Sequence, residues 1–175
     1  MSIKRMLVVR CSDDFSDEQI KFLHAFLELL GFDLKYDEGF NETDFTNSFS
    51  SCGFMFDYVY LVGHSNEDVF GNKKINFSWD FVAETIQNSE CVTDECKLII
   101  KSCKSIDDNI ANILFTKTTK IQQVLGSTID LENFSGYVGS MLFFYLTEWK
   151  NLEHTKATEL TNTTTLNSFK SYLRA

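Results

Sequence analysis

Short apolar runs alternate along the chain with longer segments of helical periodicity, and this alternation constrains the fold more than any other feature. It is typical of an α/β domain in which helices cover both faces of a mostly parallel sheet. The predicted strands are Lys4–Arg10, Phe32–Tyr36, Phe56–Val62, Lys97–Ile100 and Ile121–Leu125. The predicted helices are 16–31, 79–87, 107–115, 133–149 and 163–173. A hairpin is expected over 68–77. Functional loops in such sheets follow the C-terminal ends of the strands.

The composition fits a single domain, because 175 residues with 43% hydrophobic content are enough for one packed core. The 16 basic and 25 acidic residues give a net charge of −9, which argues against a general nucleic-acid or anionic-membrane binder. No apolar run approaches the roughly 18–20 residues of a membrane-spanning helix. The N-terminal segment also lacks the longer apolar region of a signal peptide.

The cysteines lie at irregular spacings, at positions 11, 52, 91, 96 and 103. An odd number of cysteines without an export signal predicts reduced thiols and a cytoplasmic location. No C-x-x-C pair occurs, so neither a zinc site nor any other metal or cofactor is expected.

Two residues with catalytic chemistry follow predicted strands. His64 comes directly after the strand Phe56–Val62 and Gly63, and Cys103 follows the strand that ends near Ile100. If these strands are parallel neighbours, both side chains emerge at the same edge of the sheet, where an imidazole would activate a thiol for attack on a carbonyl. The dipole of the helix after Cys103 would stabilise the thiolate. The alternative is structural, because a free cysteine often packs as a small hydrophobic residue.

Several motifs together resemble the caspase-like cysteine peptidases, and most closely the CHAT group, which is related to separase. The motifs are Tyr60-Leu61-Val62-Gly63-His64, Ser78-Trp79-Asp80-Phe81-Val82, Leu98–Ser105, Val124–Thr128 and 134–145. The resemblance implies a caspase-like three-layer sandwich over 1–150, with 151–175 as a C-terminal extension that packs as a helix on the same domain. It also implies a cysteine endopeptidase in regulated proteolysis, such as bacterial defence signalling, with a separate sensor or activator protein as partner.

The same resemblance assigns roles to individual residues. It makes His64 the base and Cys103 the nucleophile, with Gly63 in the turn and the backbone amides of Ser65 and Cys103 at the oxyanion. The family normally has a glycine after the histidine, where this chain has Ser65. A side chain at that position would crowd the oxyanion site or change the turn, so an inactive relative is an open alternative.

A specificity pocket is expected beside the nucleophile. The residue two positions before it lines this pocket in related proteases, and here that residue is Lys101. Arg10 ends the first strand and would add a second cation, which would favour an acidic side chain on the substrate. Ser105 is a further candidate. Asp13 and Asp14 are candidates of opposite charge, and solvation of Lys101 and Arg10 at the surface is the competing interpretation.

Two other functions remain open from the sequence. The segment Leu61–Ser65 resembles the Gly-x-Ser-x-Gly nucleophile elbow of α/β-hydrolases, with Ser65 as nucleophile, although Glu67 replaces the last glycine. The strand and helix order also permits a catalytically inactive signalling or adaptor module, such as a flavodoxin-like or Toll-receptor-like domain. Phosphate-binding glycine-rich loops are absent, which excludes the common nucleotide-binding classes.

Overall fold

The computed structural model describes residues 3–50, 52–72 and 74–174, apart from the side chains of residues 133 and 134. The strands are β1 Lys4–Arg10, β2 Phe32–Glu38, β3 Phe56–Val62, β4 His64–Ser65, β5 Val69–Gly71, β6 Asn76–Ser78, β7 Val92–Lys101, β8 Ile121–Ser127 and β9 Phe169–Leu173. The helices are α1 Asp17–Leu29, α2 Glu42–Ser48, α3 Trp79–Asn88, α4 Asp108–Lys117, α5 Asn133–Phe144, the π-helix η1 Tyr145–Trp149 and α6 His154–Thr165.

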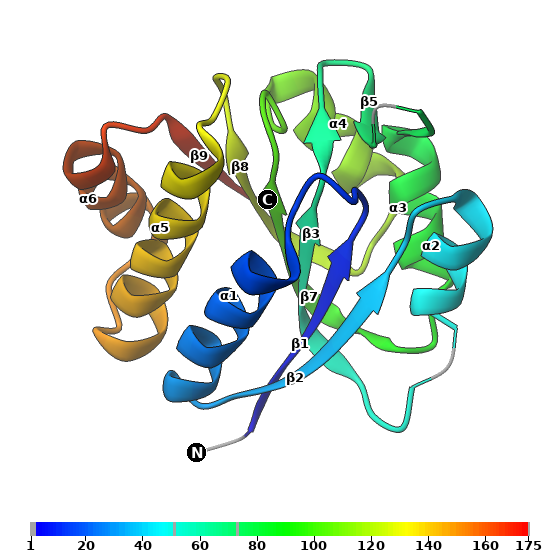
Figure 1. The fold of residues 1–175 in the computed structure, drawn as a ribbon, viewed down its shortest axis with the longest axis horizontal. Helices are drawn as coiled ribbons and strands as arrows, with labels where there is room; N and C mark the ends of the chain where they lie inside the picture. The colour runs from blue at the N-terminus through cyan, green and yellow to red at the C-terminus, as the bar shows by residue number, and fades with distance from the viewer. Residues whose placement is uncertain (1–2, 51, 73, 175) are drawn as a thin grey trace.

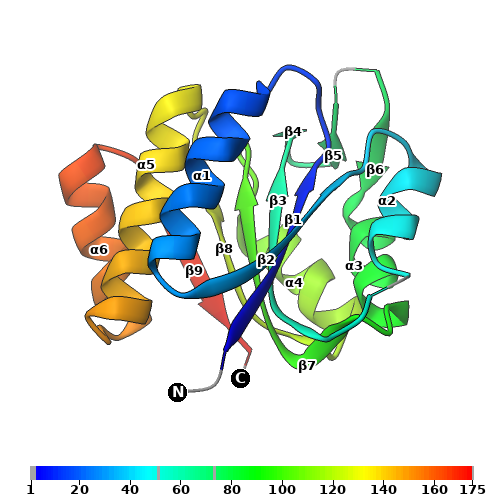
Figure 2. The ribbon, with the colours of Figure 1, turned by 60° about the horizontal axis from the view of Figure 1, so that its bottom comes forward.

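A six-stranded sheet forms the centre of the molecule, in the order β2-β1-β3-β7-β8-β9 (Figure 1). Its first five strands are parallel, and β9 runs antiparallel to β8. Helices α1, α5 and α6 cover one face, and α2, α3 and α4 cover the other (Figure 2). The expected α/β class and three-layer sandwich are confirmed.

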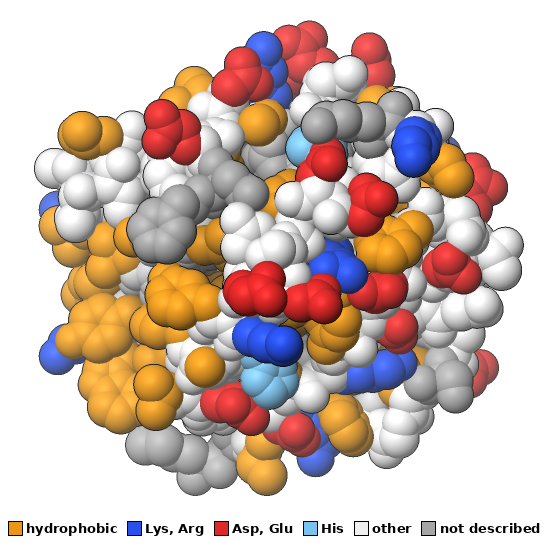
Figure 3. Space-filling view, in the orientation of Figure 1, with side chains coloured by type: hydrophobic (Ala, Val, Ile, Leu, Met, Phe, Trp, Pro, Cys, Tyr) orange, Lys and Arg blue, Asp and Glu red, His pale blue; other side chains and the backbone are white. Residues whose placement is uncertain are grey.

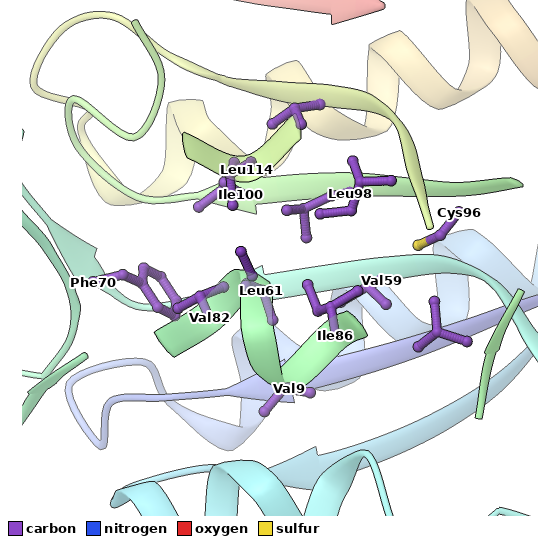
Figure 4. Packing of buried hydrophobic residues seen from close by; sticks show 14 of the residues in the cluster. Val9, Val59, Leu61, Phe70, Val82, Ile86, Cys96, Leu98, Ile100 and Leu114 are labelled. Atoms are coloured by element: carbon purple, nitrogen blue, oxygen red, sulfur yellow. The ribbon is translucent and has the colours of Figure 1, made fainter. Parts of the chain in front are cut away.

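Side chains of β3 show why the sheet needs helices on both faces. Tyr58 and Tyr60 pack into the apolar core on the α1/α5 side, whereas Val59 and Leu61 pack into the core on the α3/α4 side. Successive residues of a strand point to opposite faces, so a continuously apolar strand must be covered twice. Figure 4 shows Val59 and other residues of the α3/α4-side core from close by.

Local signals in the sequence set several element boundaries. The capping box predicted at the start of the first helix is present: the Ser16 hydroxyl accepts from the Gln19 amide, and the Gln19 side chain accepts from the Ser16 amide. Gly31 follows that helix with φ of 84°, a left-handed conformation that glycine adopts without strain. The predicted hairpin is also present, as the antiparallel pair β5 and β6.

The prediction for the C-terminal segment is wrong in detail. A helix was expected over 163–173, but α6 covers His154–Thr165 and residues Phe169–Leu173 form β9. The side chain of Glu153 caps the start of α6, and Leu166 ends it in a left-handed conformation with φ of 55°. The segment beyond Leu166 forms a strand because β8 offers an open edge for pairing and Phe169 is buried there. Tertiary pairing has overridden local helical periodicity.

The expectation of uniformly reduced thiols is also wrong. Cys52 and Cys91 form a disulfide with Cα atoms 5.6 Å apart, whereas Cys11, Cys96 and Cys103 are free. The disulfide links the segment before β3 to the segment before β7, which the fold brings together although they are 39 residues apart in sequence. Spacing alone gave no sign of this pair, because cysteine connectivity depends on the tertiary fold.

Within residues 3–50, 52–72 and 74–174, no helix has both the length and the apolarity needed to cross a bilayer. The same residues contain no cluster of three or more His, Cys, Asp or Glu side chains arranged to hold a metal ion.

Candidate functional site

The two proposed catalytic residues lie at the same edge of the sheet. β3 and β7 are parallel neighbours, with Val62 opposite Lys101. His64 follows Val62 by two residues, and Cys103 follows Lys101 by two, so both emerge beyond the C-terminal ends of these strands. They share a cavity of about 290 Å³. Its lining residues are Asp14, Phe15, Gly63, His64, Lys101, Ser102, Cys103 and Leu131.

His64 is held by a carboxylate from another loop. Its Nε2 lies 2.8 Å from Oδ2 of Asp14, in the loop between β1 and α1, and its ring packs 5.3 Å from the ring of Phe15. The side chain is 36% exposed, so it is accessible from the cavity. An Nε2–H that donates to the carboxylate leaves Nδ1 as the proton acceptor, which is the tautomer a general base needs.

Cys103 sits in a tight turn after β7. The next residue, Lys104, has φ of 43°, and its amide donates to the carbonyl of Ile129. The amide of Leu131, in the loop before α5, lies 3.3 Å from Sγ of Cys103 and donates to it. This N–H would stabilise a thiolate. The sequence predicted that the dipole of the helix after Cys103 would stabilise the thiolate. That helix, α4, begins only at Asp108, and the N–H that contacts the sulfur belongs instead to Leu131 in the loop before α5.

Gly63 and Ser65 shape the turn that carries His64. A Cβ atom at Gly63 would lie 2.8 Å from both the Gly71 carbonyl oxygen and the Phe70 ring, so only glycine fits there. The Ser65 hydroxyl donates to the backbone carbonyl of Cys103, and the Ser65 Oγ lies 2.6 Å from the Oγ of Ser102. The Ser65 side chain therefore ties the histidine strand to the cysteine turn.

The position of Ser65 also bears on the α/β-hydrolase alternative. A nucleophile elbow places its serine in a turn between a strand and a helix. Ser65 instead belongs to the short strand β4, which pairs with β5, and no helix begins until Trp79. The hydroxyl is held by the cysteine turn, so the geometry does not favour a serine nucleophile here.

Lys101 is a buried cation within the cavity. The residue is 3% exposed, and its Nζ lies 4.0 Å from the ring centre of Phe15 and 4.4 Å from that of Tyr137. Burial lowers the pKa of Lys101 to about 7, and the nearby Cys103 opposes the shift. Lys101 is therefore not a solvated surface charge.

The remaining predicted pocket residues lie elsewhere. Arg10 forms ion pairs with Asp17 and Glu38 and donates to the Phe15 carbonyl. Asp13 is exposed, and neither it nor Arg10 is among the residues that line the cavity.

Ser105 is buried below the cysteine turn. It donates to the Ile100 carbonyl and accepts from the Ser127 amide, so it joins β7 to β8. The structure thus brings together Asp14 and Lys101 with His64 and Cys103, and it separates Arg10, Asp13 and Ser105 from them.

Sequence reasoning missed two features of the site. Asp14 was assigned to a specificity pocket, whereas its carboxylate contacts the histidine. Its position just beyond the C-terminal end of β1 was the available signal, because that end shares an edge with β3 and β7. The Leu131 amide had no sequence signal, since any residue supplies a backbone N–H.

Known proteins resemble this chain in three-dimensional structure and not in sequence. No protein-family model matches the chain, and no curated protein is similar in sequence. The crystal structure of the Arg-specific cysteine proteinase gingipain R superposes with a TM-score of 0.64 at 15% identity, over 97% of this chain and 46% of that chain. A complex of the Porphyromonas gingivalis gingipain pro- and mature domains superposes with a TM-score of 0.57 at 12% identity, over 97% and 47%. The chain spans less than half the length of these proteinases and shares their caspase-like α/β fold.

Proposed function

We propose that the chain is a cysteine endopeptidase in which Cys103 is the nucleophile, His64 the general acid and base, and Asp14 a positioning residue. The proposal rests on the 2.8 Å contact between His64 and Asp14 in the cavity that Cys103 also lines. A nucleophile, a base and a group that orients the base are the parts that covalent acyl transfer needs. The fold shared with two proteinase structures supports the same reaction class.

The proposed reaction has two steps. His64 takes the thiol proton, and the Cys103 sulfur attacks the carbonyl carbon of the peptide bond. The C–N bond then breaks, His64 gives its proton to the leaving amine, and a thioester remains on Cys103. In the second step His64 deprotonates a water molecule that attacks the thioester. The C–S bond breaks, the substrate acid leaves, and the proton returns to the sulfur.

Charge that develops on the substrate oxygen needs hydrogen-bond donors. We assign this role to the backbone amides of Ser65 and Cys103, which belong to the turns that carry the two catalytic side chains. The Ser65 side chain donates to the carbonyl of Cys103, so these two turns are fixed relative to each other. Ser65 in place of glycine is therefore compatible with activity.

The physiological setting is a further part of the proposal. The sequence resemblance to the CHAT group supports regulated proteolysis, such as bacterial defence signalling, with a separate sensor or activator protein. The free thiols of Cys11, Cys96 and Cys103 support a cytoplasmic location, and the Cys52–Cys91 disulfide argues against it.

The test combines a fluorogenic peptide library with alkylation by iodoacetamide and mass mapping. We expect the native protein to cleave peptides and Cys103 to be alkylated. Cys103→Ala should abolish both signals. Cys96→Ala is the matched control, since Cys96 is fully buried and burial raises the pKa of its thiol to about 12. That control should retain peptide cleavage.

Two outcomes would overturn the proposal. Cleavage that persists in Cys103→Ala but disappears in Ser65→Ala would indicate a serine hydrolase. An unreactive Cys103 together with no cleavage of any peptide, in folded protein, would favour the inactive signalling or adaptor module.

A further inference from the structure

The loop between β1 and α1 supplies two residues to the cavity, and the proposed function uses only one of them. Asp14 contacts the His64 ring at Nε2, whereas Phe15, the next residue, packs against the ring itself. The centres of the two rings are 5.3 Å apart, and their planes are inclined by 33°. This separation lies within the range of direct aromatic contacts, about 4.5–7 Å.

We propose that Phe15 is a positioning residue for the proposed base: its ring fixes the plane of the His64 imidazole, and Arg10 holds Phe15 in place. This inference rests on the proposed peptidase function, which assigns no role to Phe15 or Arg10, and it adds both residues to that function.

A single hydrogen bond does not define the orientation of an imidazole. The contact with Asp14 fixes the position of Nε2, but the ring can still turn about the line of that bond. Phe15 restricts this rotation, because a turned imidazole would collide with the neighbouring ring. The two contacts together fix the direction of Nδ1, the atom that must take the thiol proton. Proton transfer depends on such alignment, and small misplacements are costly.

Phe15 is itself held firmly. It is 5% exposed and belongs to the apolar core on the α1/α5 side. Its backbone carbonyl accepts a hydrogen bond of 2.9 Å from Nη1 of Arg10. The same guanidinium forms ion pairs with Asp17 and Glu38, which offset the cost of burying its charge. Arg10, expected from the sequence as a pocket cation, therefore anchors the loop that carries Phe15.

The loop is also fixed at both of its ends. At its start, the amide of Cys11 donates to the carbonyl of Val62, the last residue of β3, at 2.7 Å. At its end, Ser16 caps α1. His64 follows Val62 by two residues, so Phe15 and His64 are both tied to the end of β3. A side chain positions a reactive group well when its own supports are rigid.

Surface charge gives no direction to the imidazole ring. The chain carries a net charge of −9, and acidic side chains are spread over the face shown in Figure 3. Such charges are screened over about 8 Å at physiological salt, and they act on the ring as a whole. The orientation of His64 therefore depends on its direct contacts with Asp14 and Phe15.

The first test is steady-state kinetics on a cleaved peptide. Phe15→Met keeps an apolar, flexible side chain but removes the flat ring. We expect kcat to fall by on the order of 10–100-fold with KM nearly unchanged, because the lost contact aligns the base during reaction. Phe15→Leu, a second variant without a ring, should behave alike, and Phe15→Tyr should recover most of the activity. A raised KM with unchanged kcat would make Phe15 a substrate contact and overturn the inference.

Phe32→Met is the matched control for the loss of a buried ring. Phe32 is also 5% exposed and belongs to the same core, but it packs against Tyr58 and Phe144. It is not among the residues that line the cavity. This variant should keep the wild-type kcat per folded molecule. A loss equal to that of Phe15→Met would show that general destabilisation explains both, which would overturn the inference.

A double-mutant cycle tests the role of Arg10. Arg10→Lys keeps the charge, but an ammonium lacks the fork of donors that reaches Asp17, Glu38 and the Phe15 carbonyl together. We expect Arg10→Lys to lower kcat in the wild type and to add little to Phe15→Met, because both act on the same ring. Losses that multiply fully would show that Arg10 does not act through Phe15.

A spectroscopic measurement separates this inference from the proposed function. The chain has three histidines, so His64→Ala identifies the ring signals of His64 in proton NMR spectra. The ring current of Phe15 should shift these signals, Phe15→Met should remove the shift, and Phe32→Met should keep it. This result would support the inference even if no peptide is cleaved, which would overturn only the peptidase function. Unchanged His64 signals in Phe15→Met, or an unchanged kcat, would overturn the inference.

Discussion

Two lysines of β7, one in the middle of the strand and one at its C-terminal end, lie on the same face of the sheet, and their surroundings differ. Lys97 donates to the Tyr58 hydroxyl at 3.0 Å and forms an ion pair with Glu148 at 3.3 Å. Lys101, four residues further along, lines the cavity with Cys103 and sits between two aromatic rings. Lys97 is therefore part of an ion-pair group, whereas Lys101 lines a cavity that Cys103 also lines.

The two lysines of one strand therefore have different partners. Glu148 is placed by η1, the π-helix after α5, and its side chain is only 9% exposed. Lys4 from β1 completes that ion-pair group at 2.7 Å. The Lys97 group joins the sheet to η1, whereas the loops beyond the C-terminal ends of the strands carry His64 and Cys103.

The largest expected effect is on the proposed catalysis, in the cavity beyond the C-terminal ends of β3 and β7. His64→Ala should lower kcat/KM by about 10²–10⁴-fold, because it removes the general acid and base. His154→Ala is the matched control, since that ring lies against Phe143 away from the cavity and should leave kcat/KM unchanged. Steady-state kinetics with one peptide checks both variants. Equal losses of kcat/KM in the two variants would contradict a specific role for His64.

The second effect is on stability, at the ion-pair group around Lys97. Glu148→Gln should lower the free energy of unfolding by about 2–3 kcal/mol, because Lys4 and Lys97 lose the carboxylate between them. Urea unfolding measures the change. Catalysis per folded molecule should stay the same.

The ion-pair group at Glu148 also has a pH signature. Burial opposes ionisation of Glu148, but the hydrogen bond from Lys4 and the charge of Lys97 outweigh it, and the pKa falls below the ordinary 4.5. A depressed carboxyl pKa contributes stability that is present above the unfolded value and is lost as pH falls through the folded pKa. The wild type should therefore lose more stability than Glu148→Gln below pH 4.5. Parallel pH curves for the two proteins would argue against the pairing.

The third effect is a substitution that should raise stability, whereas Glu148→Gln lowers it. Burial lowers the pKa of Lys101 from 10.5 to about 7, so the unfolded state binds more protons between these values. The free energy of unfolding should rise with pH over this window, because the penalty for a buried ammonium is relieved. Lys101→Met should flatten the rise and add about 1–2 kcal/mol of stability at pH 7. Chemical unfolding across this window tests it, and a destabilised Lys101→Met would show that the ammonium is structural.

The smallest effect concerns the Ser65 hydroxyl, which joins the turn that carries His64 to the turn that carries Cys103. Ser65→Ala should cost about 1 kcal/mol of stability and less than tenfold in kcat/KM, because it removes the hydroxyl contacts with the Cys103 carbonyl and Ser102 Oγ but leaves the backbone donors. A loss comparable to that of Cys103→Ala would point instead to a direct chemical role for the serine.

Much of the fold was predictable because the signals are local. The strand Phe56–Val62 has the same bounds in the sequence prediction and in the structure, since a run of large apolar residues ending in glycine is unambiguous. The Ser16 capping box was also readable, because both partners lie three residues apart. The C-terminal strand was not, because Phe169–Leu173 becomes a strand only through pairing with β8.

The candidate site divides in the same way. His64 and Cys103 could be selected from the sequence, since each follows an apolar strand and parallel neighbours share an edge. The role of Asp14 depends on the loop that turns its carboxylate toward the ring. Arg10 and Lys101 look equivalent as cations at strand ends, yet Arg10 pairs with Asp17 and Glu38 while Lys101 lines the cavity.

The sequence by itself determined the layered architecture and the sheet edge at which His64 and Cys103 lie, because hydrophobic periodicity and the order of the elements can be read from neighbouring residues. Only the tertiary structure decided which side chains meet: Asp14 with His64, Glu148 with Lys97, and Cys52 with Cys91. These pairs join residues that are 39 to 51 positions apart in the chain. Burial and loop geometry set them, and neither can be read from neighbouring residues in the chain.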